Sequence, residues 1–288
     1  MKHLIIFPAL VLLNLTVYAQ KMPSDYFEEG AKAAEDSNYT KAVSCFKYIV
    51  EHHPHNELYS KAFFNVGYLY HAQNYDDSAE MVFRGILNGN FNEREALGGD
   101  IMDDPYANFK HRSAFLLHVI FKKRQQYDSA MRYLVMADTV YPYLHFCGNE
   151  LAENTIYMAL CYGDLYNKMG KHKKAESSLL RVAFPNGLAG NGQAIDSLKA
   201  LMSKDDDKEE IKQQLGHAIN NYFIDTSYYD SGKDTSYSYC IYFMKTKMDI
   251  GYREPRYSAD DKPDTRPLHE KVVAYIKETP FYQMVQSL

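Results

Sequence analysis

Two short stretches of this chain hold side chains that could bind a metal ion. Three histidines surround Pro54, at positions 52, 53 and 55, but no second cluster stands at the spacing that a zinc site needs. The acidic run Asp205–Glu210 lacks the alternating oxygen ligands and the turn glycine of a calcium loop. We therefore interpret the histidines as a solvated helix end and the acidic run as a helix cap. We expect no metal ion and no other cofactor.

The residues for covalent catalysis are also sparse. Cys147 follows His145 by two positions, the nearest approach to a thiol–imidazole pair, but the sequence assigns no oxyanion donor to that loop. No serine stands in a Gly-x-Ser-x-Gly elbow. The Gly190–Gly192 segment follows no predicted strand, so it does not match a phosphate-binding loop. We expect no catalytic residues and a protein that is not an enzyme.

The overall charge argues against a nucleic-acid partner. The 32 basic and 37 acidic residues give a formal net charge of -5, whereas nucleic-acid binding normally selects a strongly basic surface. The four cysteines are widely and irregularly spaced: Cys45, Cys147, Cys161 and Cys240. A chain of this length does not need disulfides to hold a core, so we expect free, buried thiols. Cys147 with Cys161 is the pair in which a disulfide should be checked first.

The first twenty residues are typical of a secretory signal peptide. Lys2 supplies a positive start, an apolar run extends over Leu4–Tyr18, and Ala19 is a small residue at the expected cleavage site. A retained membrane anchor is the less favoured interpretation, because a spanning helix needs about 20 apolar residues. We expect residues 1–20 to be removed. The mature protein is then exported, periplasmic or extracellular, without a transmembrane segment.

A spacing of small and large apolar residues recurs four times before position 187. Each copy has an anchor alanine, a large apolar residue four positions later, and a small residue twelve positions earlier in all copies but the third. The anchors are Ala42, Ala79, Ala130 and Ala175; the large residues are Phe46, Phe83, Leu134 and Leu179; the earlier positions hold Gly30, Gly67, His118 and Gly163. Residues four apart share a helix face, so each copy predicts two helices in close contact across a short polar turn. Pro54 and Pro142 end the first and third copies.

This spacing resembles the tetratricopeptide repeat (TPR) family, whose pattern is W-x2-L-G-x2-Y, then A-x3-F, then P. Gly67 and Tyr70 with Ala79 and Phe83 match it well. The departures are the absence of tryptophan, His118 at a glycine position, and anchor separations of 37, 51 and 45 residues, against about 34 in the family. Loops must therefore be inserted, over Asn88–Pro105 and around Tyr143–Glu150.

The fold class expected from this resemblance is mainly α. Residues 21–187 form a TPR-like α-solenoid of about four helix pairs, in which the first helix of each pair lines a hollow. An ordinary helical bundle with the same spacing by chance is the alternative, and it would close its helices around a single core. Residues 188–288 form a separate C-terminal region.

The C-terminal region predicts two further helices and a β-hairpin. A helix over Gln193–Met202 and a second one through Ile211–Ile219 could form a degenerate fifth pair that caps the repeats. The turn Asp230–Asp234 is followed by alternating residues that share one strand face, namely Tyr237, Tyr239, Ile241 and Phe243. A lone hairpin is marginal in water, so this ribbon must pack on helices or on a partner.

The chain ends in a predicted helix over Leu268–Ile276. A short turn after it is expected to dock by Phe281, Tyr282 and Met284.

The family resemblance implies which residues line the hollow. Carried over position by position, they include Lys61, Phe64, Tyr68, His71, Arg112, Phe115, Lys122, Lys123, Tyr157, Asp164, Asn167 and Lys168. The five basic side chains among them, Lys61, Arg112, Lys122, Lys123 and Lys168, would form a basic strip inside an acidic protein. Such a strip could hold an acidic peptide or a chain carboxylate, or it could simply solvate the groove.

The sequence therefore predicts an exported, non-enzymatic TPR adaptor or scaffold that binds a protein or peptide, within an envelope-associated complex. The alternative is an enzyme or ligand-sensing protein whose active or binding site lies in residues 188–288, with the repeats used for docking. A deep pocket with convergent polar groups in that region would favour the alternative.

Overall fold

The computed structural model describes residues 21–97, 104–184, 188–205, 207–228, 235–254 and 263–288. The expected signal peptide and the predicted turn at 230–234 lie outside these residues. By its contacts the chain divides into two compact units, Met1–Tyr75 and Asp76–Leu288.

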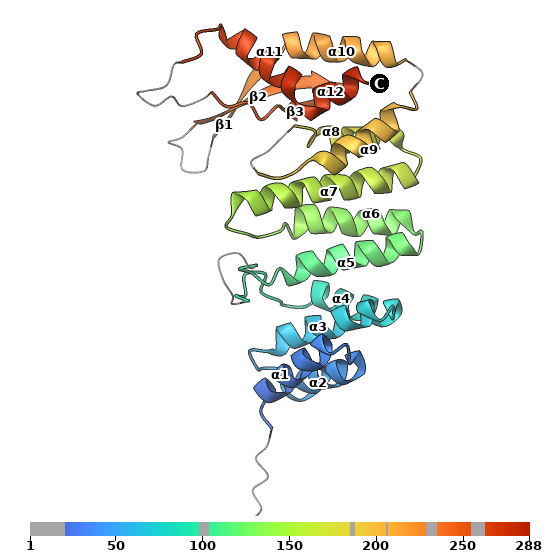
Figure 1. Cartoon of the computed structure of the whole chain (residues 1–288). Helices are drawn as coiled ribbons and strands as arrows, with labels where there is room; N and C mark the ends of the chain where they lie inside the picture. The colour runs from blue at the N-terminus through green and yellow to red at the C-terminus, as the bar shows by residue number, and fades with distance from the viewer. Residues whose placement is uncertain (1–20, 98–103, 185–187, 206, 229–234, 255–262) are drawn as a thin grey trace, which may run out of the picture. The chain divides into compact units, whose positions relative to one another are not determined.

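Helices account for most of the described chain. Unit 1 contains α1 (Pro23–Glu35), α2 (Tyr39–His52) and α3 (Tyr59–Ala72). Unit 2 contains α4 (Asp76–Asn88), α5 (Phe109–Lys123), α6 (Tyr127–Val135) with a π-helical turn (Met136–Val140), α7 (Gly148–Lys168), α8 (His172–Leu180), α9 (Gly192–Met202), α10 (Lys208–Asn220), β1 (Phe223–Tyr228), β2 (Thr235–Phe243), β3 (Thr246–Asp249), α11 (Leu268–Glu278) and α12 (Pro280–Gln286). The predicted fold class, helical repeats followed by a helical region with a small antiparallel sheet, is confirmed. Within unit 2, α5, α6 and α7 follow one another in space (Figure 1).

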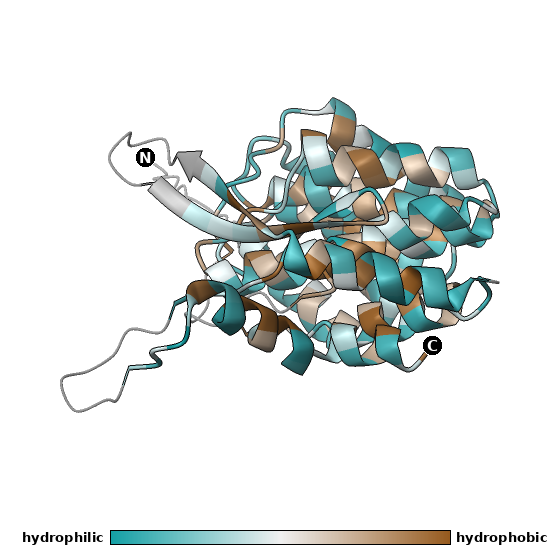
Figure 2. Ribbon diagram, turned by 90° about the horizontal axis from the view of Figure 1, so that it is seen from above, coloured by the Kyte–Doolittle hydropathy of each residue, from teal (hydrophilic) through white to brown (hydrophobic). Residues whose placement is uncertain are grey.

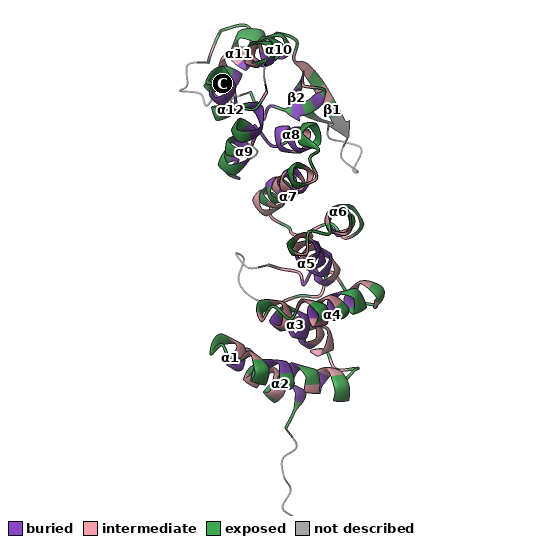
Figure 3. Ribbon diagram, turned by 90° about the vertical axis from the view of Figure 1, so that its right-hand side faces the viewer, coloured by how far each residue is buried: buried purple, intermediate pink, exposed green. Residues whose placement is uncertain are grey.

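The repeated side chains are the ones that the helices bury. All four anchor alanines have no exposed surface, and the four large residues that follow them are at most 2% exposed. Buried and exposed positions therefore alternate along each helix (Figure 3). Hydrophobic and hydrophilic residues alternate along the helices as well (Figure 2), as expected for amphipathic helices.

Glycine permits the close approach of paired helices. A Cβ atom added to Gly30 of α1 would lie 3.1 Å from the Cβ of Cys45 and from the ring of Phe46 on α2. In unit 2, a Cβ on Gly163 of α7 would lie 2.9 Å from Cγ of Leu179 on α8. The small residue of the first helix is therefore needed because the backbone lies directly against the large side chain of the second.

The turn inside each repeat has one fixed backbone feature that was not predicted. The residue five positions before each anchor alanine has a left-handed conformation: φ is 59° at Ser37, 61° at Asn74, 57° at Gln125 and 71° at Gly170. Only the last of these is a glycine, so the other three copies hold a strained conformation with ordinary side chains. The same local geometry in four copies is independent support for the repeat.

His118 replaces the small residue in the third copy without opening the helix pair. Its side chain is completely buried, and its Nδ1 lies 3.0 Å from the carbonyl oxygen of Ala130, the anchor on α6. Burial lowers the pKa of His118, and nearby Lys122 adds to this, against the opposing effects of the Ala130 carbonyl and of Asp164. A hydrogen bond between α5 and α6 thus takes the place of glycine contact.

The two inserted segments meet through a hydrogen bond from the Tyr143 hydroxyl to Asp104, and both are tied to the start of α5. Asn108 is completely buried; its amide donates to the carbonyls of Tyr106 and Leu144 and accepts from the backbone N–H of Leu144 at 2.9 Å. Glu93, from the first insertion, accepts hydrogen bonds from the backbone N–H groups of Lys110 and His111 and so caps the first turn of α5. The insertions are therefore anchored to the repeat.

The sheet has the antiparallel order β1-β2-β3, with Ile224 opposite Tyr239 and Ile241 opposite Met248. The predicted shared face of β2 is confirmed for Tyr239, Ile241 and Phe243, which are buried, whereas Tyr237 remains 59% exposed. The prediction of a two-stranded hairpin missed β3. The turn between β2 and β3 consists of Met244 and Lys245, whose φ values are 47° and 63°. Asn-Gly is the sequence that usually indicates a turn of this geometry.

The C-terminal elements share one core with the last repeat. The buried cluster runs from Ala152 on α7 to Val285 on α12 and includes α8, α9, α10 and the sheet. The ring of Phe281 lies 5.2 Å from that of Phe184 and 5.8 Å from that of Phe243. The predicted docking of the last turn is therefore confirmed.

The expected fifth helix pair is arranged differently from the others. Both helices form where they were predicted, but α9 packs on α8 and α12, while α10 packs on β2, α11 and α12. The sheet supplies apolar surface that a regular repeat would have taken from a neighbouring helix.

Candidate protein-binding groove

Unit 2 contains a groove that is lined by residues of α5, α7 and α9. These are the first helices of the third, fourth and fifth predicted pairs. The groove consists of two adjoining cavities of about 560 and 490 Å³, which share Tyr157, Leu160 and Gln193. The first cavity is also lined by Lys122, Cys161, Gly163, Asp164, Asn167, Leu179, Asp196, Ser197, Ala200, Leu201 and Lys204. The second adds Tyr143, Glu150, Glu153, Asn154, Ile156 and Gly190. We refer to these two cavities as the α5–α7–α9 groove.

Helix α7 provides the central strip of this groove. Tyr157, Leu160, Asp164 and Asn167 follow one another at three- and four-residue intervals, so they lie on one face of the helix. Tyr157 is 51% exposed and so provides apolar contact area on this surface. Four of the residues predicted from the family resemblance, Lys122, Tyr157, Asp164 and Asn167, are therefore brought together in one cavity.

Ion pairs neutralise most of the predicted basic strip. Lys122 Nζ of α5 lies 3.2 Å from Asp164 Oδ2, and Lys168 Nζ lies 3.3 Å from Asp164 Oδ1. The lining of the first cavity contains two lysines, Lys122 and Lys204, and two aspartates, Asp164 and Asp196. The second cavity adds Glu150 and Glu153. The groove is thus balanced in charge at one end and acidic at the other, and the charge excess expected for an acidic ligand is absent from its lining.

The other predicted residues of unit 2 lie around the groove or away from it. The ring of Phe115 is 5.3 Å from that of Tyr157 and extends the aromatic surface. Arg112 pairs with Asp104, which also accepts a hydrogen bond from the hydroxyl of Tyr143; burial, together with this bond, raises the pKa of Tyr143.

Lys123 belongs to another contact. Its Nζ is 2.7 Å from Asp76 in the first turn of α4, and it is not among the residues that line the groove.

Four predicted residues belong to unit 1. Lys61, Phe64, Tyr68 and His71 lie on α3, where the rings of Phe64 and Tyr68 stack with centroids 6.5 Å apart. Tyr68 is 51% exposed and the other three are partly buried. Within unit 1 they form an aromatic surface with one basic side chain and one imidazole.

The four thiols are free in the structure, and no disulfide joins Cys147 to Cys161. The predicted burial is confirmed for Cys45, Cys161 and Cys240 and is wrong for Cys147. Cys161 lines the groove but is buried, and burial raises its pKa to about 11. Cys147 is partly buried, and its backbone N–H donates to Nδ1 of His145 at 2.9 Å. That ring nitrogen is therefore engaged by the backbone.

The other stretches with candidate chemistry are occupied by structural contacts. His52 stacks on Tyr48 with ring centroids 4.3 Å apart, and its Nδ1 lies 3.1 Å from the Tyr48 carbonyl oxygen. Asp207 accepts a hydrogen bond from the backbone N–H of Glu210 at 2.9 Å, which confirms the predicted cap of α10. In the described part of the chain, no three His, Cys, Asp or Glu side chains gather closely enough to hold a metal ion.

A further cavity lies largely in residues 188–288, the region in which the alternative interpretation places a site. It lies between α8, α10 and the β2–β3 turn, and its volume is about 750 Å³. Its residues come from segments far apart in the sequence, so no sequence spacing predicts that they lie together.

Among the helices described, none is both long and apolar enough to cross a membrane.

Comparisons with known proteins find similarity among solved structures. No protein-family model matches the chain, and no curated protein matches it. Among solved structures, the crystal structure of a thermophilic TPR protein from Thermus thermophilus is similar over 69% of this chain and 90% of its own, with a TM-score of 0.35 and 16% sequence identity. At this TM-score the similarity supports no conclusion about function.

Proposed function

We propose that the protein is a non-enzymatic scaffold that binds a segment of a protein partner in the α5–α7–α9 groove. The supporting observation is a continuous hollow on the first-helix surface, in which half-exposed Tyr157 stands between polar side chains of α5, α7 and α9. Concave surfaces of stacked helix pairs are typical binding surfaces of repeat proteins.

The lining suggests the character of the bound segment. Tyr157, Leu160 and Leu201 offer apolar contact, Asn167 and Gln193 offer amide groups, and the second cavity carries Glu150 and Glu153. A segment with an apolar residue at its centre and a basic residue toward the second cavity would match this arrangement.

Export is part of the proposal and depends on the sequence alone. The apolar, singly charged N-terminus of the chain supports secretion to the periplasm or the cell exterior, in association with an envelope complex. If this is correct, the protein recovered from the exported fraction lacks about the first 20 residues, and its intact mass is lower by their mass. Full-length protein retained in the cytoplasm would contradict it.

The binding experiment compares two exposed tyrosines. Protein expressed from the full chain is used for affinity capture with Tyr157→Ala in the groove and Tyr237→Ala on β2, whose side chains are 51% and 59% exposed. Losing a central aromatic contact should reduce recovery of the specific partner by about tenfold or more, since such a contact contributes on the order of 2 kcal/mol. Recovery should be unchanged with Tyr237→Ala. Equal recovery with both variants would remove the groove from the proposal.

The alternative, a site within residues 188–288, has one observation in its favour. The cavity between α8, α10 and the β2–β3 turn lies largely in that region. Its lining includes four carboxylates and two lysines, and Lys173 forms ion pairs there with Glu176 and Asp205. This arrangement supports ligand binding.

A further inference from the structure

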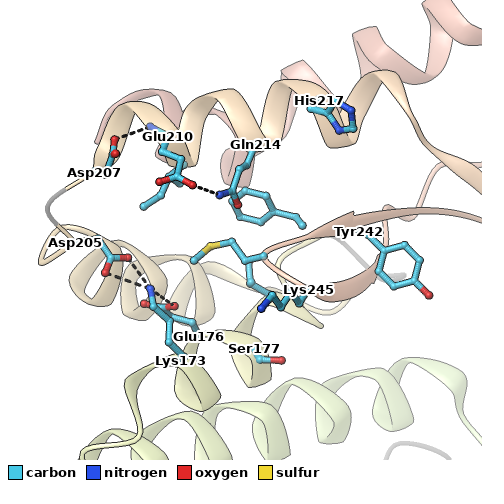
Figure 4. A pocket seen from close by; sticks show the side chains of 14 residues that line it. Lys173, Glu176, Ser177, Asp205, Asp207, Glu210, Gln214, His217, Tyr242 and Lys245 are labelled. Carbon is cyan, nitrogen blue, oxygen red and sulfur yellow. Dashed lines mark hydrogen bonds and ion pairs between the residues drawn. The ribbon is translucent and has the colours of Figure 1, made fainter.

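The cavity between α8, α10 and the β2–β3 turn has the size of a ligand site. Its volume of about 750 Å³ lies within the usual range of about 300–1,000 Å³. Helix α8 lies on one side and α10 on the other, with Lys245 of the β2–β3 turn between them (Figure 4). The cavity shares no lining residue with the α5–α7–α9 groove, so the inference drawn from it is independent of the function proposed there.

The walls of the cavity are fixed in place. Ser177 of α8 accepts a hydrogen bond from the Thr246 hydroxyl, at 2.9 Å, which ties the β2–β3 turn to the helix. Leu180, Ile211 and Phe243 line the cavity and are nearly or fully buried. An apolar wall that is rigid before binding can accept an aliphatic chain at low ordering cost.

Acidic groups outnumber basic groups in the lining of this cavity. Four carboxylates line the cavity, from Glu176, Asp205, Asp207 and Glu210, against the two ammonium groups of Lys173 and Lys245, a formal charge of -2. His217 is the other titratable nitrogen in the lining.

Glu176 marks the deep end of this charged set. It is only 3% exposed, and its Oε2 lies 3.2 Å from Lys173 Nζ but accepts no hydrogen bond of good geometry among the described groups. Lys173 Nζ also lies 3.1 Å from Asp205 Oδ2. The cavity therefore already holds one alkylammonium between two carboxylates, with its stem along α8.

The other two carboxylates have neutral partners. Asp207 accepts from the backbone N–H of Glu210, and Glu210 accepts from the side-chain amide of Gln214 at 2.9 Å. Neither forms an ion pair with any cation in the part of the chain that the structure describes. Both face the cavity next to Ile211, so negative charge without a cationic partner stands beside an apolar wall.

We propose that this cavity binds a lysine or arginine side chain presented by a peptide segment. The cationic head lies between Asp207 and Glu210, and the aliphatic stem lies against Ile211, Leu180 and Phe243. Lysine and arginine suit such a site because each combines a long apolar stem with a charged end.

The test uses three peptides that differ only in one side chain. Acetyl-Ala-Lys-Ala-amide, its arginine analogue and its norleucine analogue are titrated against the full protein, with saturation-transfer NMR as the measure of binding. The lysine and arginine peptides should bind, and norleucine should bind about tenfold more weakly, because it keeps the stem and lacks the charge. Equal binding of the norleucine peptide would overturn the proposal. So would the absence of saturation transfer to all three peptides at about 20 mM, since a Kd of about 1 mM already corresponds to weak binding.

Two neighbouring glutamates provide the matched control. Glu210→Gln removes the charge inside the cavity and keeps an acceptor for Gln214, whereas Glu209→Gln removes a charge from a side chain that is 76% exposed, pairs with Lys212 and does not line the cavity. Both lie in the first turn of α10, so effects on helix stability are matched. Glu210→Gln should weaken binding of the lysine peptide about five- to tenfold, and Glu209→Gln less than twofold.

Equal weakening by the two variants would mean that the peptide binds a diffuse acidic surface, and would overturn the proposal. Tyr157→Ala should leave lysine-peptide binding unchanged. Weakening by Tyr157→Ala would place the peptide in the groove instead of this cavity.

Discussion

Lys122 on α5 and Lys168 on α7 share one carboxylate, that of Asp164, with Nζ–Oδ distances of 3.2 and 3.3 Å. The contact joins two consecutive first helices at the surface where a partner would bind. A single aspartate therefore decides whether the first cavity of the groove is neutral or positive.

Asp164→Asn should make that cavity attract acidic ligands. The substitution frees two ammonium groups, so a labelled glutamate-rich heptapeptide should bind several-fold more tightly to the variant, and the gain should disappear at high salt. Fluorescence anisotropy measures this. The free energy of unfolding should change by less than about 1 kcal/mol, because the three side chains are partly exposed. Asp128→Asn, an exposed position on α6, is the control for net charge, and an equal gain there would contradict the assignment.

Gly163→Ala should destabilise the protein. The new Cβ would lie 2.9 Å from Cγ of Leu179, which is buried and cannot move freely, so overpacking costs about 1–3 kcal/mol and exceeds the gain in helix propensity. Gly216→Ala on α10 meets nothing within 4 Å and should instead stabilise by up to about 1 kcal/mol. Urea unfolding of the two variants gives opposite signs if this packing is correct.

His118 should make stability depend on pH. Burial, reinforced by Lys122, holds the pKa of the folded imidazole below its ordinary value, despite the Ala130 carbonyl and Asp164. The unfolded chain therefore takes up a proton near pH 6.5 and the folded chain does so only at lower pH. The contribution to stability is complete above pH 6.5 and is lost as pH falls.

His118→Gln, which keeps an N–H donor for Ala130, should lose less stability than the natural protein between pH 7.5 and 5.5. The measurement is chemical unfolding of both proteins across this range, and the difference between the two curves isolates His118 from the other histidines. Parallel curves would contradict the buried, neutral imidazole.

The thiols should differ in reactivity. Cys147 is partly buried, whereas Cys45, Cys161 and Cys240 are buried; burial raises the pKa of Cys161 to about 11 and also raises that of Cys240. At pH 8 a thiol reagent such as dithionitrobenzoate should label Cys147 first, and should label all four after unfolding. Two thiols missing from the unfolded count would indicate a disulfide instead.

Most of the helical part could be predicted from the sequence, because the same packing requirement recurs. Ala42 and Phe46 must lie on one face, as must Ala175 and Leu179, and four such copies indicate which face of the second helix in each pair is buried. His118 broke the pattern in sequence but not in structure, because a side-chain hydrogen bond replaced a glycine contact.

The contacts between distant segments could not be predicted in this way. Arg112 pairs with Asp104 of an insertion, and Lys123 pairs with Asp76 of another helix. The sequence pattern shows the basic residues but not the aspartates that the fold brings next to them. Strand β3 escaped prediction because Met244 and Lys245 adopt a turn for which they are poor candidates. The α8–α10 cavity exists only after the sheet has packed.

The continuity of the apolar cluster from Ala152 to Val285 limits how this protein can be cut or recombined. Removal of the segment after α8 would expose the interior side of the last repeat to solvent, and an exposed surface of that kind promotes aggregation. For the same reason, an exchange of modules between genes would have to carry α7 and α8 together with everything that follows them.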